Sequence, residues 1–221
     1  MKLSKSVFSM LLIYCSLQQI AGAVMVEDLF TVEMPIADQT TSLRLEAFSE
    51  AFRQVVIKVS GSDDALKSSA FERPTERSSR YVKQFRYISQ NLPDEEEFES
   101  NRLLLRIDFD QQLIEGLLRE HNFPIWGRER PSSLLVISYD VNENIKLVSQ
   151  DATPDLIELL DQAASRHAVP VLFPLMDLED ISMINIGDIV SREVEGIKRM
   201  AARYSPDALV IGQIVGRSGQ G

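Results

Sequence analysis

Apolar and polar residues follow two different periods in the first half of the chain. Residues 29–36 alternate between apolar and polar side chains, which is typical of a half-buried strand. From Leu43 to Val59 the apolar residues recur every three to four positions, which is the period of a helix with one buried face. The pattern therefore predicts a strand followed by an amphipathic helix that ends at Gly61, a residue type favoured at helix ends.

The alternation returns further along and predicts a hairpin. Residues 81–89 and 103–109 both read as strands, and the acidic run 94–99 lies in the connection between them. Asp110 is placed to cap a following helix, whose apolar stripe ends near Asn122. The order strand, helix, strand, strand, helix is close to that of a split β-α-β unit.

The second half predicts a different arrangement, in which helices and strands alternate. Its apolar segments show little alternation, which favours strands that are buried on both faces. Helices between such strands are typical of an α/β layer with parallel neighbours joined by crossovers. The expected helices span 153–167 and 186–204, and the expected strands span 134–139, 145–148 (an antiparallel edge), 169–173 and 208–215.

A connector rich in turn-forming residues separates the halves. Residues 123–131 read FPIWGRERP, with prolines and a glycine that interrupt regular structure. We expect the fold class α/β: two small modules of mixed sheet with packed amphipathic helices, an α+β domain over 24–122 and a layered α/β domain over 132–221. Because a glycine-rich end follows a buried strand directly, the second domain is expected to be truncated.

The first residues have the order of a secretory signal peptide. Lys2 and Lys5 precede an apolar run over 7–17, and small residues follow up to Ala23. This order predicts export and cleavage after Ala23, with removal of residues 1–23. The apolar run is too short to cross a bilayer, and no later run is long enough, so the processed protein is expected to be soluble and without a transmembrane segment.

Composition narrows the partners and the compartment. The 221 residues include 23 Lys+Arg and 33 Asp+Glu, for a net charge of −10. This excess of acids argues against nucleic-acid binding and against docking on anionic lipid. Cys15 is the only cysteine, so the processed chain would have no disulfide and no thiol site. A bacterial periplasm is the compartment that these features favour.

Side chains that could carry out catalysis are few. His121 and His167 are the only histidines, and each lies at a predicted helix end, where the carbonyl groups favour a cation. Asp108 and Asp110 form a carboxylate pair, but Asp110 is better explained as a helix cap. The acidic run 94–99 is typical of a solvated loop. We therefore predict no catalytic residue, no metal site and no cofactor.

The connector holds the candidate binding residues Trp126, Arg128 and Arg130. A tryptophan flanked by arginines is typical of an interface anchor or a sugar-stacking site. The alternative is that Trp126 packs in the corner between the halves while Arg130 bonds to backbone carbonyl groups. Sugar stacking would require an exposed indole face.

Short segments across the first half and the connector carry a resemblance to a known family: residues 26–30, 32–39, 59–61, 81–85, 117–120, 123–127 and 130–131. Together they resemble the bacterial domain of unknown function 2066, a family of secreted proteins. The segment 204–215 is similar to part of the N-terminal domain of TolB. The first resemblance implies an exported envelope protein, longer than this chain and without an assigned reaction.

Three hypotheses about function follow. The leading one is a non-catalytic, exported periplasmic protein that binds an envelope protein or a cell-wall component. The second is a hydrolase that works through Asp108, Asp110 or the run 94–99, which requires two carboxylates in one cleft and a raised pKa for one of them. The third is a sugar-binding module of the cell wall that uses Trp126.

Overall fold

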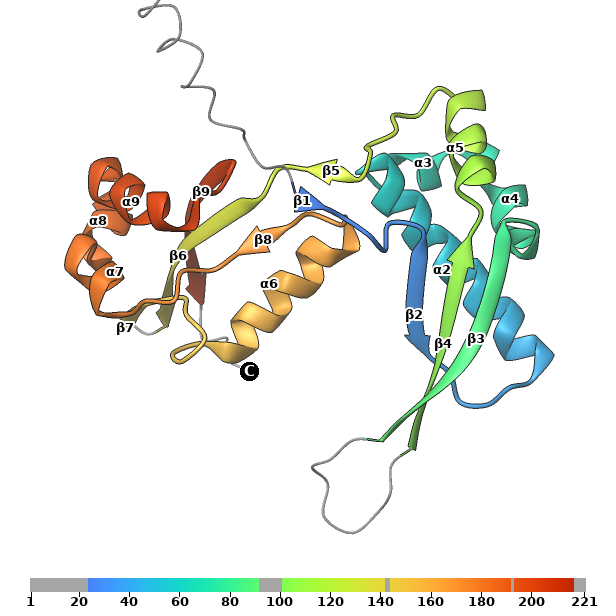
Figure 1. Cartoon of the computed structure of the whole chain (residues 1–221), viewed down its shortest axis with the longest axis horizontal. Coiled ribbons are helices and arrows are strands. Elements are labelled where there is room, and N and C mark those ends of the chain that lie inside the picture. Colours follow the sequence, from blue (N-terminus) through green and yellow to red (C-terminus); the bar gives the residue numbers. More distant parts are fainter. Residues whose placement is uncertain (1–23, 92–100, 142–143, 192, 217–221) are drawn as a thin grey trace, which may run out of the picture.

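The computed structural model contains helices and sheets in both halves, as the sequence predicts (Figure 1). The sheet of the first half is antiparallel, and only that of the second half is mixed. The predicted signal peptide, its cleavage point at Ala23 and the acidic run 94–99 lie outside the residues that the structure describes. No helix in the described part of the chain is both long and apolar enough to cross a bilayer. The described residues are 24–91, 101–141, 144–191 and 193–216.

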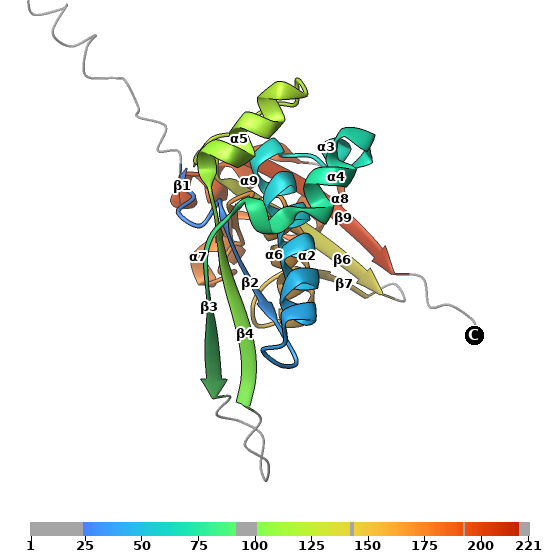
Figure 2. The ribbon, with the colours of Figure 1, turned by 90° about the vertical axis from the view of Figure 1, so that its right-hand side faces the viewer.

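The first half is built on a three-stranded antiparallel sheet covered on one face by a long helix. Strand β4 (Asn101–Phe109) lies in the middle, between β2 (Thr31–Pro35) and β3 (Val82–Asn91). Since both neighbours are antiparallel to β4, they run parallel to each other, as the predicted split β-α-β unit requires. Helix α2 (Thr41–Ser60) packs along the sheet, and α5 (Gln111–Glu120) follows β4 (Figure 2).

The core of this half forms between α2 and the middle strand. Phe52 and Val55 of α2 and Leu105 and Ile107 of β4 are all 0% exposed. Burial of each such side chain contributes about 1.5–3 kcal/mol, which explains why the helical period and the strand alternation are both visible in the sequence. Short helices connect α2 to β3: α3 (Asp64–Lys67), η2 (Ser69–Phe71), α4 (Glu72–Glu76) and η3 (Ser78–Arg80).

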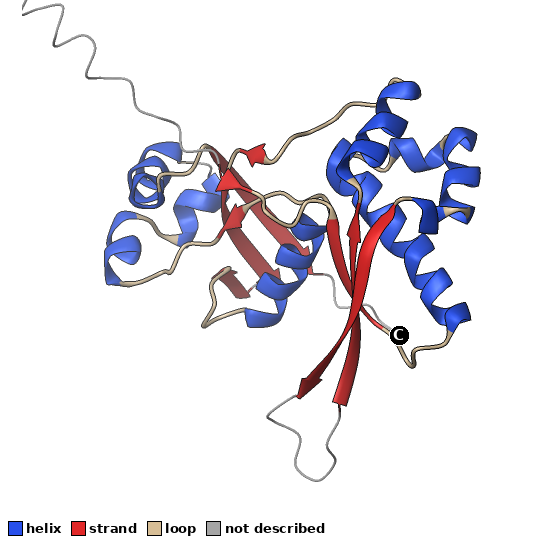
Figure 3. Ribbon diagram, turned by 45° about the vertical axis from the view of Figure 1, so that its right-hand side comes forward, coloured by secondary structure: helices blue, strands red, loops and turns tan. Residues whose placement is uncertain are grey.

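The second half is a mixed sheet with helices on both sides. Strand β9 (Ala208–Gly216) pairs in parallel with the whole of β6 (Ser133–Val141). On the other side of β6, β8 (Val171–Leu172) is parallel and β7 (Asn144–Leu147) is antiparallel, as predicted. Helix α6 (Pro154–Arg166) lies on one side of the sheet, and the helices that precede β9 lie on the other (Figure 3).

The single helix predicted over 186–204 is wrong, because the chain forms three shorter pieces there. After α8 (Ile186–Ser191), the extended backbone of Glu193 interrupts the helix, and its N–H donates to Asp188 O at 2.7 Å. Gly196 then packs directly on α7 (Leu178–Met183), the helix before α8: a Cβ at position 196 would lie 2.8 Å from Met183 O. The interruption at Glu193 lets the following helix, which contains Gly196, pack against the backbone of α7. The other two pieces are α9 (Val194–Ala201) and η4 (Ala202–Tyr204).

A buried carboxylate ties α7 to the turn before β9. Asp180 is 0% exposed and accepts hydrogen bonds from Tyr204 Oη at 2.5 Å and from Met176 N at 3.0 Å. The Arg203 guanidinium bonds to the same carboxylate and also pairs with Asp177 at 2.9 Å. Asp177 in turn caps α7 by accepting from Asp180 N at 2.9 Å. These contacts join two segments that lie more than twenty residues apart.

This cluster predicts a loss of stability in acid. The hydrogen bonds from Arg203 hold the pKa of Asp177 well below its ordinary value, at about 2. A depressed carboxyl pKa contributes stability that is complete above about pH 4 and is lost as the pH falls toward 2. Asp177→Asn should therefore lower the stability at neutral pH and flatten its decline between these values. Urea unfolding at several pH values measures both effects, and Asp151→Asn, at an exposed position, is the control. If the unfolding free energy depends on pH equally in the two variants, the prediction is contradicted.

Candidate functional site

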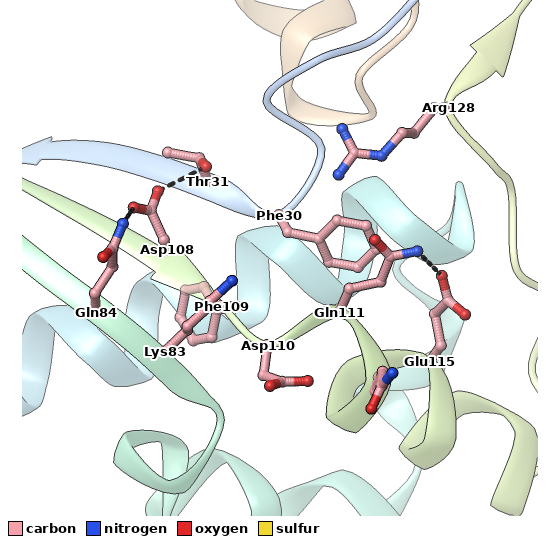
Figure 4. Close-up of a pocket in the computed structure, with 11 residues that line it drawn as sticks. Phe30, Thr31, Lys83, Gln84, Asp108, Phe109, Asp110, Gln111, Glu115 and Arg128 are labelled. Atoms are coloured by element: carbon pink, nitrogen blue, oxygen red, sulfur yellow. Dashed lines mark hydrogen bonds between the residues drawn. The ribbon is translucent and has the colours of Figure 1, made fainter.

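A cavity of about 790 Å³ opens where the three-stranded sheet meets the start of α5 (Figure 4). Its volume lies within the range of small-molecule sites, about 300–1,000 Å³. Most of the lining side chains are polar or charged, so the cavity suits a polar ligand. It is lined by Phe30, Thr31, Lys83, Gln84, Asp108, Phe109, Asp110, Gln111, Gln112, Glu115 and Arg128.

The cavity forms because β4 runs directly into α5. Asp110 lies between the two elements and accepts from Leu113 N at 3.1 Å, which confirms the predicted helix cap. The helix buries Ile114 and leaves Gln111 and Gln112 exposed at its first turn. The cap therefore positions two amide side chains beside the end of the sheet.

Asp108 lies on β4 and is held in place by side chains of the two neighbouring strands. Its carboxylate accepts from Thr31 Oγ1 of β2 at 2.8 Å and from Gln84 Nε2 of β3 at 2.7 Å. Arg106 Nε lies 3.7 Å away. Burial raises the pKa of Asp108, but these hydrogen bonds, with Arg106 and Arg86 nearby, outweigh burial and hold the pKa below its ordinary value. Asp108 is thus a fixed, ionised acceptor.

The structure brings together the two carboxylates that the sequence pairs. Asp108 and Asp110 both line the cavity, but Figure 4 shows that they point in different directions, Asp108 toward Thr31 and Gln84 and Asp110 toward α5. The hydrolase hypothesis requires a carboxyl group with a raised pKa, and that of Asp108 is lowered. The two carboxylates therefore share one cavity, as a hydrolase requires. Asp108, however, lacks the raised pKa that a general acid needs.

The rim of the cavity carries charges of both signs. Arg128 donates to Glu27 O at 2.6 Å, and its guanidinium carbon lies 5.5 Å from the centre of the Phe30 ring. Gln111 Nε2 donates to Glu115 Oε1 at 2.8 Å. Lys83 is exposed, and its side chain makes no hydrogen bond or ion pair with another described residue. An incoming ligand can therefore bind this ammonium group without displacing a contact from any of the described residues.

Sequence reasoning identified Arg128, Asp108 and Asp110 but missed the rest of the lining. Lys83 and Gln84 are consecutive residues of β3, so the alternation predicts that they point to opposite faces. The register shift between Val82 and Gln84 is not visible in the sequence. Polar residues of this kind occur on every exposed surface. A signal appears only when the strands are aligned, because that alignment brings three separate segments to one place.

Trp126, the first of the predicted binding residues, packs at the junction between the halves. Its ring covers Gly61, where a Cβ would lie 2.9 Å from Trp126 Cε3. Gly61 has φ +75°, so it combines a left-handed backbone with this close approach. The backbone N–H of Trp126 donates to Val59 O at 2.7 Å and satisfies one of the last carbonyls of α2.

Arg130 is buried at the same junction, at 0% exposure. Its guanidinium carbon lies 4.2 Å from the centre of the Trp126 ring, a cation–π distance. Burial lowers the pKa of Arg130. Carbonyl oxygens at the ends of α2 and α6 and in the connector offset the cost of burying its charge. The acceptors are Lys58 O at 2.5 Å, Trp126 O at 3.1 Å, Gly127 O at 3.0 Å, His167 O at 2.5 Å and Ala168 O at 2.9 Å.

The junction thus follows the packing alternative that the sequence left open. Arg130 bonds to carbonyls of both halves, and Trp126 contacts Gly61 and Arg130. Beside them, β1 (Val24–Met25) pairs with β5 (Glu129–Arg130). Of the three predicted binding residues, only Arg128 lines the cavity, and ligand binding by the other two stays a prediction.

The two histidines lie at helix ends, as predicted. His121 is the C-cap of α5 and His167 is the C-cap of α6. Within the described ranges, no three His, Cys, Asp or Glu side chains converge in a way that could hold a metal ion. The polar cavity is therefore the arrangement around which a function can be argued.

Comparison with known proteins corrects the resemblance inferred from short segments. Residues 23–127 match the model of a domain of unknown function, DUF8605, and nothing supports a likeness to the domain of unknown function 2066 or to TolB. The segments behind those likenesses are short, and each pattern is common by itself. No curated protein and no solved structure matches the chain. The family to which residues 23–127 are similar is thus DUF8605.

Proposed function

We propose that this chain is an exported, non-catalytic binding protein of the bacterial cell envelope, with its ligand site in the cavity at the start of α5. The N-terminal order of Lys2, Lys5, an apolar run and Ala23 supports export. Recovery from the periplasm of a chain that begins at Val24 tests this part. Recovery of an unprocessed chain from the cytosol would contradict it.

The lining of the cavity points to a polar ligand with hydroxyl and amide groups. Three glutamines, Gln84, Gln111 and Gln112, offer both donors and acceptors. Lys83 and Arg128 can bind a carboxylate, and Asp110 can bind an ammonium group. A glycan fragment that carries a short peptide combines all these groups, so a cell-wall component fits the cavity better than an apolar ligand does.

The observation that carries the proposal is the state of Asp108. A general acid needs a pKa close to the working pH, whereas hydrogen bonds hold the pKa of Asp108 below its ordinary value. A carboxylate fixed by Thr31 and Gln84 has the same charge and direction with or without a ligand. Such preorganised acceptors favour binding.

Calorimetric titration of the purified chain with a muropeptide, a disaccharide bearing its stem peptide, tests the proposal. We expect binding that weakens about tenfold in Lys83→Ala and in the double variant Gln111→Ala/Gln112→Ala, as the loss of hydrogen bonds to a charged ligand predicts. Lys146→Ala, an exposed lysine on β7, should bind like the wild type. Absence of binding, or equal weakening in all variants, would refute the site.

A carboxylate-dependent hydrolase is the second candidate, because Asp108 and Asp110 line the same cavity. The same muropeptide, incubated with the protein and analysed by mass spectrometry, separates the two functions. A binding protein leaves the fragment intact. Cleavage that Asp110→Asn abolishes would establish the hydrolase instead.

A further inference from the structure

Strand β9 has one open edge. Among the described residues it pairs only with β6, since β7 and β8 occupy the opposite side of that strand. Figure 2 shows β9 as the outermost strand of its sheet. An open edge presents a row of backbone N–H and C=O groups that can pair with another strand.

The composition of this edge is unusual for a strand that ends a sheet. Natural edges carry charges, prolines or bulges that prevent pairing, and β9 (ALVIGQIVG) has none of these. A quarter of all residues in the chain are charged, so their absence from nine consecutive positions matters. Val210 is 44% exposed and Val215 is 61% exposed. The sequence of β9 is therefore typical of a strand with neighbours on both sides, although β9 lies at the edge of its sheet.

We propose that a second copy of this chain covers the edge, with the two β9 strands antiparallel about a two-fold axis. Pairing along the full strand places the axis at its midpoint, Gly212. Val210 then lies opposite Ile214 of the second copy, and Leu209 lies opposite Val215. These apolar cross-strand pairs stabilise the contact, and the exposed valines become buried.

Symmetry favours a second copy, and the uncharged composition of β9 removes the electrostatic obstacle to it. Each copy has a net charge of −10, so two copies repel each other wherever acidic surfaces meet. Because β9 carries no acid, this edge can pair with itself without placing like charges opposite each other. The edge is also self-complementary along about 30 Å, as an isologous two-fold contact requires.

A cysteine at the axis tests the arrangement directly. Gly212→Cys is introduced with Cys15→Ser, which makes it the only thiol; a Cβ at position 212 would lie 3.8 Å from Ile137 Cγ1, an ordinary contact. Directly opposed residues of antiparallel strands lie about 4.5–5.5 Å apart, within disulfide range. Mild oxidation should yield a covalent dimer. Gly116→Cys on α5, where a Cβ meets nothing within 4 Å, should form no covalent dimer.

Sedimentation equilibrium gives an independent readout. Val210→Glu brings acidic charges onto the edge and should weaken dimerisation at least about tenfold. Leu113→Glu, at a similarly exposed apolar position on α5, should leave it unchanged. A wild-type chain that is monomeric at all concentrations overturns the proposal. So does a dimer that Val210→Glu does not weaken, or a Gly212→Cys variant that forms no crosslink.

Discussion

Replacement of Arg130 by alanine is expected to lower the free energy of unfolding by about 3–5 kcal/mol. The side chain is 0% exposed, and its guanidinium donates to five carbonyl oxygens. Alanine leaves these buried acceptors without donors and leaves a cavity under Trp126. Because Lys58 O lies at the end of α2 and His167 O at the end of α6, the substitution should also loosen the junction between the halves.

Denaturant unfolding measures this loss, and the fluorescence of Trp126, the only tryptophan, reports on the junction. Arg128→Ala is the matched control, since its side chain makes one backbone hydrogen bond, and it should cost about 1 kcal/mol. Arg130→Lys should be intermediate, because one ammonium group cannot reach all the carbonyls. If the Arg130→Ala variant is as stable as the Arg128→Ala variant, Arg130 does not stabilise the junction between the halves.

The second large effect is expected at Asp180. Asp180→Ala should cost about 3 kcal/mol, because Arg203, Tyr204 and Met176 N all lose a buried charged acceptor. The cost should be local to the second half. Burial, followed by the hydrogen bond to Asp180, raises the pKa of Tyr204, so the alanine variant should also ionise Tyr204 at lower pH.

Thermal unfolding measures the stability, and a spectroscopic pH titration measures the ionisation of Tyr204. Hydrogen exchange should show faster opening of α7 with little change in α2. Asp161→Ala, an exposed carboxylate on α6, serves as the control and should change stability by less than about 0.5 kcal/mol. Equal destabilisation of both halves would contradict the expectation that Asp180 stabilises the second half alone.

The parts of the fold that could be predicted depend on neighbours in the sequence. The period of α2 and its end at Gly61 follow from one buried face and one left-handed residue. The cap at Asp110 depends on a backbone N–H three residues away. The single helix over 186–204 was wrong because Gly196 packs on Met183 O, a contact that no local pattern contains.

The candidate site depends on contacts that local reasoning cannot find. Thr31 and Asp108 are 77 residues apart, and only the register of β2 on β4 brings them together. The direction of the pKa of Asp108 follows from that register, since its hydrogen-bond partners lie on neighbouring strands. The short segments read as a likeness to the domain of unknown function 2066 failed for a related reason, because brief patterns recur in unrelated chains.

By itself, the sequence determined most of the longer elements and the buried faces of α2 and α5, because periodicity and capping are properties of neighbouring residues. It also carried the acidic charge and the signal-like start, which are properties of composition and order. Tertiary structure alone decided that Arg130 joins the ends of two helices and that β9 lies at an edge. It also decided that polar side chains from β2, β3, β4 and α5 meet around one cavity. Each of these outcomes requires the chain to close long loops, and the pairing that results depends on all the surfaces that pack together.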